Sequence, residues 1–245
     1  MVFLGFATIY DEQIAEMLFA QAQGFADFFY VYGELPSLVL GTLAWLYVAN
    51  SLTHKNKHLV ASFIAFGFGL SVVIQPLRYL GMFNIWMIPI LATLVLLLMR
   101  SFTRMQYKIN DRYFNHCLII GFTVLLAIII PQTIKLIWAR PRPYMVFNGA
   151  SFQAWTIGFN LTLDNAYKSF PSGHSAVTAS LISLAIFKPD LKPERYKFLM
   201  LCVGVYVGLM MISRMVRGDH YLSDVLFGVL ITGVIFKLIQ AKYRK

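Results

Sequence analysis

Seven long apolar stretches dominate this sequence and constrain its fold more than any other feature. They cover residues 35–52, 59–77, 85–99, 117–134, 172–187, 198–212 and 222–239. A helix needs roughly 20 mostly apolar residues to cross a bilayer. Hydrophobic residues make up 58% of the chain and charged residues only 13%, so too few polar side chains remain to coat a water-soluble globule. The sequence therefore predicts an all-α, polytopic transmembrane helical bundle with about seven spans.

The N-terminal segment, residues 1–33, differs from the rest because it is only partly apolar and contains no lysine or arginine. Residues 13–30 have apolar side chains at helical spacing, with polar residues between them: Glu16, Gln21, Gln23 and Asp27. This pattern predicts an interfacial amphipathic helix; a start that omits an upstream span is the alternative. Residues 34–245 are predicted to form the membrane domain.

Lysine and arginine are distributed unevenly between the two sets of connecting loops. Thirteen lie on one side and seven on the other, and Lys237 lies within the last span. Because cytoplasmic loops carry the excess of basic residues, we expect a cytoplasmic C-terminus, with residues 1–33 and the long loop 136–171 outside. The net charge of +10 comes from short clusters between apolar stretches. This spacing does not suit a nucleic-acid backbone, and no nucleic-acid partner is expected.

Three short segments at the expected outer ends of the spans hold an unusual concentration of polar residues. They are KLIWARPRP (135–143), PSGH (171–174) and SRMVRGDHYLSD (213–224). Lys135, Arg142 and Arg214 gather three cations at one membrane face, which suggests an oxyanion as their partner. Ser172 and Gly173 open a predicted helix, so their backbone N–H groups and the helix dipole add a second anion-binding element.

The histidines of these segments suggest a reaction that the bound anion undergoes. His220 and Asp224 are four residues apart and so share one helix face. A carboxylate that fixes one ring nitrogen leaves the other as a nucleophile or base, and His174 remains as the complementary acid, an arrangement suited to phosphoryl transfer. These three residues could instead ligate a metal, but the three cations would repel a divalent ion and no further acidic ligand is evident.

The three segments together resemble the type 2 phosphatidic acid phosphatase (PAP2) family, whose signature is K-x6-RP, PSGH and SR-x5-H-x3-D. Every fixed position is matched: Lys135, Arg142 and Pro143; Pro171 to His174; Ser213, Arg214, His220 and Asp224. The signature region is 135–224, and the resemblance extends over the last four predicted spans. The family's usual core has six spans, and soluble haloperoxidases with a similar signature are disfavoured by the apolar stretches.

The resemblance implies a role for each matched residue. His220 is the expected nucleophile that forms a phosphohistidine, and Asp224 orients it. His174 is the expected acid for the leaving group and then the base for water. The phosphate oxygens are expected to be held by Lys135, Arg142, Ser172, Gly173 and Arg214. No metal or other cofactor is implied.

Two further arginines lie beside the signature residues. Arg140 and Arg217 either help to bind a second phosphate or face lipid headgroups, and we expect the latter.

The resulting hypothesis is an integral membrane lipid phosphatase whose site faces the outer leaflet, with the lipid bilayer and a lipid phosphate as its partners. Its expected location is a bacterial cell (inner) membrane. Candidate substrates are phosphatidic acid, phosphatidylglycerol phosphate, polyprenyl pyrophosphate and lipid A phosphates. A lipid phosphotransferase could use the same site. An anion or lipid transporter is the alternative from another class, but apart from Lys237 the predicted span interiors carry no charge to line a pathway.

The distribution of basic residues predicts the topology. Reporter domains should be found in the cytoplasm when fused after Lys57, Lys108, Lys192 or Lys245, and outside when inserted near Gly149 or Gly218. A cytoplasmic reporter at Gly149 would contradict the expected position of the site.

Overall fold

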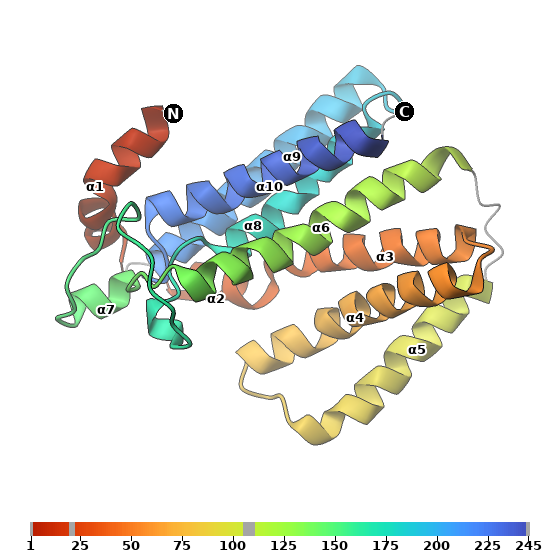
Figure 1. Ribbon diagram of the computed structural model, residues 1–245, viewed down its shortest axis with the longest axis horizontal. Helices are drawn as coiled ribbons and strands as arrows, with labels where there is room; N and C mark the ends of the chain where they lie inside the picture. The colour runs from red at the N-terminus through yellow and green to blue at the C-terminus, as the bar shows by residue number, and fades with distance from the viewer. Residues whose placement is uncertain (1, 20–22, 105–110, 244–245) are drawn as a thin grey trace.

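Helices form nearly all of the regular structure. The computed structural model describes residues 2–19, 23–104 and 111–243, and no strand occurs among them. The predicted all-α fold is confirmed (Figure 1). The α-helices are α1 (Val2–Leu18), α2 (Gln23–Tyr32), α3 (Leu35–Ser51), α4 (Lys55–Tyr79), α5 (Ile88–Arg104), α6 (Asp111–Ile137), α7 (Pro143–Phe147), α8 (Gly173–Ala179), α9 (Pro193–Val216) and α10 (Leu222–Tyr243). Short 3₁₀ helices are η1 (Ile85–Met87), η2 (Asn165–Tyr167) and η3 (Ser180–Phe187).

Every predicted apolar stretch forms a helix. In the described part of the chain, five helices are long and apolar enough to cross a membrane: Gly24–Ser51, Lys55–Tyr79, Tyr113–Ile137, Pro193–Val216 and Leu222–Tyr243. Two shorter apolar helices are Ile85–Ser101 and Gly173–Phe187. Large apolar side chains such as Phe63, Phe198 and Leu238 are exposed on these helices, as expected for surfaces that contact acyl chains.

The helices pack into one bundle with a continuous apolar core. Helix α3 packs against α4 and α6, α10 packs against α6 and α8, and α5 contacts α4 (Figure 1). The core cluster includes Trp45 of α3, Phe68 of α4, Ile119 of α6 and Phe236 of α10. The C-terminus lies near one end of this bundle, and α7 lies at the other (Figure 1).

Helix α8 consists largely of small residues, which let neighbouring helices approach closely. Ser175, Ala176 and Ala179 are all buried. Gly228 of α10 lies so near the start of α8 that a Cβ there would be 2.5 Å from the Ser172 carbonyl oxygen. The contact between α8 and α10 therefore depends on a missing side chain.

The N-terminal segment contains two helices where the sequence indicated one over residues 13–30. Helix α1 ends at Leu18 and α2 begins at Gln23. Helix α1 packs against α10 and α7, and α2 packs against α9 and α4, with Asp11, Ala15 and Phe29 buried. These tertiary contacts, which a local amphipathic pattern does not reveal, hold the segment against the bundle. Its placement at the membrane interface stays a prediction.

The close approach of α10 to α8 can be tested by one methyl group. Gly228→Ala should destabilise the protein by about 1–3 kcal/mol, because the new Cβ must push against backbone atoms. Unfolding in mild detergent, followed by tryptophan fluorescence, measures the change. Gly233→Ala on the same helix is the control, because no atom lies within 4 Å of its Cβ position. Equal stabilities of the two variants would contradict this account of the helix contact.

Candidate active site

Backbone hydrogen bonds join the three polar segments at the α7 end of the bundle. The Ser172 N–H donates to the Asp224 carbonyl over 2.9 Å, which links the second segment to the third. Tyr144 directly follows the first segment, and its N–H donates to the Gly218 carbonyl of the third segment over 3.1 Å. The segments are far apart in sequence, and these bonds make them one structural unit.

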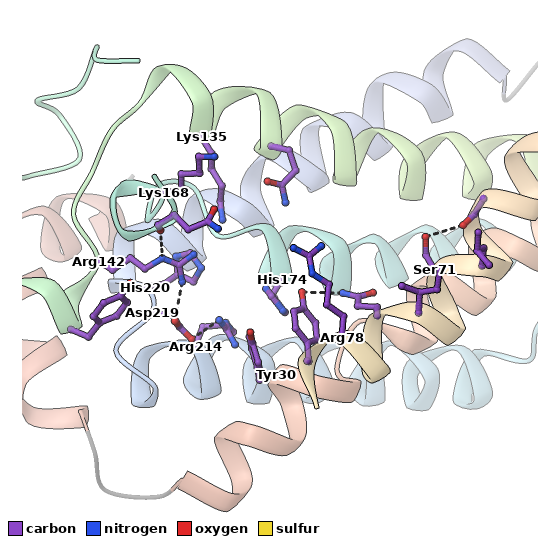
Figure 2. Close-up of a pocket in the computed structure, with 18 residues that line it drawn as sticks. Tyr30, Ser71, Arg78, Lys135, Arg142, Lys168, His174, Arg214, Asp219 and His220 are labelled. Atoms are coloured by element: carbon purple, nitrogen blue, oxygen red, sulfur yellow. Dashed lines mark hydrogen bonds and ion pairs between the residues drawn. The ribbon is translucent and has the colours of Figure 1, made fainter. Parts of the chain in front are cut away.

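The segments border a cavity of about 830 Å³. Five of the predicted site residues line it: Lys135, Arg142, His174, Arg214 and His220 (Figure 2). Asp224 and Ser172 are buried completely, and a Cβ on Gly173 would lie 3.7 Å from Lys135 Nζ. The opposite wall comes from α4, through Gly67, Leu70, Ser71, Ile74, Gln75, Arg78 and Tyr79. The cavity thus has most of its cations on the signature side, whereas the α4 wall mixes apolar residues with polar ones and a further cation, Arg78.

His220 and Asp224 form the expected pair. His220 Nδ1 lies 3.7 Å from Asp224 Oδ2, and both side chains are buried. Burial, together with the positive charges of Lys135 and Arg142, lowers the pKa of His220 from its ordinary value of 6.5 to about 3, although Asp224 acts in the opposite direction. The imidazole is therefore neutral near pH 7. With Nδ1 turned to the carboxylate, Nε2 is the nitrogen available as a nucleophile.

The Asp224 carboxylate is held by several donors besides its contact with His220. Arg140 Nη1 donates to Oδ1 over 2.5 Å. Ser169 Oγ donates to Oδ2 over 2.5 Å, and the Tyr221 N–H donates to the same oxygen over 2.9 Å. Such bonds to a carboxylate keep it ionised and fix its orientation.

His174 lies in the first turn of α8, beside two tyrosine rings that pack against each other with their centroids 4.3 Å apart. The centroids of Tyr30 and Tyr79 lie 5.7 and 5.6 Å from that of the imidazole. His174 Nδ1 is 3.6 Å from Glu34 Oε1, and Glu34 also accepts a hydrogen bond from Gln75. His174 Nε2 is buried and has no hydrogen-bond partner among the described residues. The second histidine thus faces a carboxylate of its own.

The arginines of the cavity keep some donors free. Arg142 Nη1 and Arg214 Nη2 both bind Asp219, over 2.9 and 2.5 Å. In the described part of the protein, Arg214 Nε and Nη1 are buried without a hydrogen-bond partner. Lys135 is only 6% exposed. Buried donors without acceptors are costly, and a phosphate group with three or more oxygens would satisfy them.

The structure corrects one detail of the expected anion-binding element. Ser172 caps α8 by accepting from the Ser175 N–H through its hydroxyl. Its own N–H, which the sequence indicated for anion binding, is bonded to the Asp224 carbonyl. The Gly173 N–H is left for that role.

Comparisons with known proteins identify the family of this chain. The model of the PAP2 superfamily matches residues 116–245. The chain belongs to the PAP2 superfamily. The resemblance inferred from the signature is confirmed. Phosphatidylglycerophosphatase B of Haemophilus influenzae is 39% identical over 80 residues, which are 31% of this chain and 33% of that protein. The match therefore spans about a third of this relative's length. No solved structure matches the chain.

Arg140 of this PAP2 protein does not face headgroups as expected. Its side chain is completely buried, with Nη1 on Asp224 and Nη2 2.9 Å from Asp11 Oδ2. Its guanidinium also lies 4.0 Å from the centroid of the Tyr221 ring. Burial lowers the pKa of Arg140, but Asp224 and Asp11 more than offset this, so the net shift is upward. The error arose because a basic residue at a span end usually reaches headgroups, whereas here two carboxylates compensate its burial.

Arg217 is also paired with carboxylates. It contacts Asp27 and Asp219, and its guanidinium lies 4.0 Å from the centroid of the Tyr30 ring.

Sequence reasoning missed three acidic residues around the PAP2 site, Asp11, Glu34 and Asp219, and assigned the wrong surroundings to Arg140. One available signal was scarcity, because the chain has only 11 acidic residues and an acid in an apolar environment is seldom retained without a partner. The partners themselves are distant in sequence, so no spacing pattern identifies them.

Removing the buried cation of Arg140 should lower the stability of the folded protein. Arg140→Met keeps most of the side-chain volume but leaves Asp11 and Asp224 buried without their cation, which should cost about 3–5 kcal/mol of stability. Thermal unfolding in detergent measures the loss. Arg195→Met, at an exposed position of α9, is the matched control and should change stability little. If Arg140→Met unfolds at the same temperature as wild type, the network of buried charges does not stabilise the α7 end of the bundle.

Proposed function

We propose that this PAP2 protein is a membrane lipid phosphatase that hydrolyses a phosphate monoester or pyrophosphate of a lipid through a phosphohistidine, without a metal. The observation that carries the proposal is a pair of buried histidines, each facing a carboxylate, at one cationic cavity. The name of the relative, a phosphatidylglycerophosphatase, supports the same chemistry and makes phosphatidylglycerol phosphate one candidate substrate.

In the first step, His220 Nε2 attacks phosphorus as the bond from phosphorus to the lipid oxygen breaks. The Nδ1–H of His220 faces Asp224, which stabilises the positive ring of the phosphohistidine. His174, whose Nδ1 faces Glu34, is proposed to carry a proton once the phosphate anion is bound and to give it to the departing oxygen. Lys135, Arg142 and Arg214, with the Gly173 N–H at the start of α8, are the proposed groups that stabilise the phosphoryl oxygens.

In the second step, water replaces the lipid. His174, now neutral, takes a proton from water as the water oxygen attacks phosphorus. The bond from phosphorus to His220 breaks, inorganic phosphate is released, and both histidines return to their starting states. Each step reuses groups already in place, so no metal is required.

The wall of α4 supports a lipid as the substrate. Leu70, Ile74 and Gly67 line the cavity on α4, so an acyl or prenyl chain can lie against them while the phosphate meets the signature cations. The unequal distribution of basic residues supports an outer-leaflet site in a cell membrane. Figure 1 is consistent with this arrangement. The site lies at the α7 end of the bundle, and the C-terminus, which is expected in the cytoplasm, lies at the opposite end.

The test is phosphate release by purified protein from a panel of lipid phosphates: phosphatidic acid, phosphatidylglycerol phosphate, polyprenyl pyrophosphate and lipid A phosphates. We expect release from at least one substrate, persistence in EDTA, and loss in His220→Ala. Loss in EDTA with recovery on adding Zn²⁺ or Mg²⁺ would refute the metal-free mechanism. Transfer of phosphate to another lipid, with no inorganic phosphate released, would indicate a phosphotransferase instead.

The two histidines should respond differently to the leaving group. His174→Ala should lose about 10²–10⁴-fold in rate on a lipid phosphate, whose alkoxide needs a proton, and much less on p-nitrophenyl phosphate, whose phenolate leaves unaided. His220→Ala should be inactive on both, because it lacks the covalent route. Acid-labile phosphate on the protein, followed in parallel, should be absent from His220→Ala. Equal losses on both substrates in His174→Ala would require a different role for that residue.

A further inference from the structure

Asp219 connects three arginines at the edge of the cavity. Its Oδ1 accepts from Arg142 Nη1 over 2.9 Å, and its Oδ2 accepts from Arg214 Nη2 over 2.5 Å and from Arg217 Nε over 3.1 Å. The side chain is 13% exposed and lines the cavity beside His220. Figure 2 shows Asp219 next to Arg142 and Arg214. Two of its three partners are arginines to which we assign the phosphate.

Asp219 engages only part of each guanidinium group. Arg214 keeps Nε and Nη1, which are buried and bind no described residue. Arg142 directs Nε to the Asn165 carbonyl over 2.9 Å. If the Asp219 carboxylate occupied the phosphate position, it would also bind Nε and Nη1 of Arg214. The contacts instead fix one side of Arg214 and leave the other for a ligand.

We propose that Asp219 is a positioning residue that locks Arg142 and Arg214 in one shared orientation, so that an incoming phosphate meets a preformed set of donors. This inference rests on the proposed function and extends it to how the phosphate is recognised. Long arginine side chains lose rotational freedom when they bind a ligand, and a fixed partner removes that cost beforehand.

The opposite role for Asp219 would be that of a competing anion. By Coulomb's law alone, a negative charge among the cations weakens the binding of another anion, so removing it should tighten binding. The two roles therefore predict opposite signs for the same substitution. The charge itself is present at any working pH: burial tends to raise the pKa of Asp219, but Arg214 and Arg142 together lower it to about 2.

The experiment measures binding of orthovanadate, a phosphate mimic, to the full-length protein in detergent by isothermal titration calorimetry. Asp219→Asn keeps the shape but loses the charge, and we expect its Kd to rise about tenfold or more, because two arginines must then be ordered on binding. KM for a lipid phosphate should rise in parallel.

Asp27→Asn is the matched control. Asp27 contacts Arg217 but is on the outer side of the cluster, with a side chain 53% exposed. Its substitution removes the same charge beside one of the three arginines, Arg217. The Kd for vanadate should stay within about twofold of wild type, since charge effects at exposed positions are small. An equal rise in both variants would overturn the proposal.

A second substitution covers the case in which Asp219→Asn does not fold. Asp219→Glu keeps the charge but displaces the carboxylate by one methylene group, so a positioning role predicts a weaker complex and a competing charge predicts no change. An unchanged or lower Kd in either folded variant would overturn the proposal. Because binding is measured without turnover, a wild type that binds vanadate but releases no phosphate would refute the proposed function alone.

Discussion

The geometry of the site depends on one buried charge, the guanidinium of Arg140. It bonds to Asp224 of α10, to Asp11 of α1 and to the carbonyl of Gln153 in the long loop. A charge removed from water must recover its hydration energy from bonds of good geometry, so Arg140 and its partners are stable only when all three parts of the chain are in place. Asp224 faces His220 in turn. The orientation of the proposed nucleophile is therefore tied to the packing of α1, which lies outside the signature.

The charges around the cavity follow a consistent pattern. Arg140 is balanced by two carboxylates, His174 faces Glu34, and Arg142 and Arg214 share Asp219. Each acid contacts a group that the mechanism needs in a fixed orientation. Arg214 nevertheless keeps two buried donors free. The site is thus partly neutralised and still attracts an oxyanion, which favours binding a phosphate group without holding the product too tightly to be released.

The spans and the convergence of the signature could be predicted from the sequence, because both depend on local pattern. A continuous apolar stretch specifies a buried helix wherever its neighbours lie, and all three polar segments adjoin the same ends of such stretches. The partners of Arg140 could not be predicted, since Asp11 is 129 residues away and no periodicity connects them. The break between α1 and α2 was missed for a related reason. The spacing of apolar residues along this segment suggested one continuous helix face. The two helices instead pack against different neighbours, which the spacing does not reveal.

The two histidines obtain their carboxylates in different ways, and this divides the work between the halves of the chain. Asp224 is four residues from His220 and lies within the region that matches the PAP2 superfamily. Glu34 comes from the junction of α2 and α3, outside that region. The rings of Tyr30 and Tyr79, which lie beside His174, also come from outside it. Helix α4 also supplies a wall of the cavity in which Leu70 and Ile74 alternate with polar residues. The C-terminal half thus carries the proposed nucleophile and the cations of the signature. The N-terminal half contacts the proposed acid and supplies the α4 wall of the cavity, so the proposed function places the selection of substrate largely in the part of the chain without a signature.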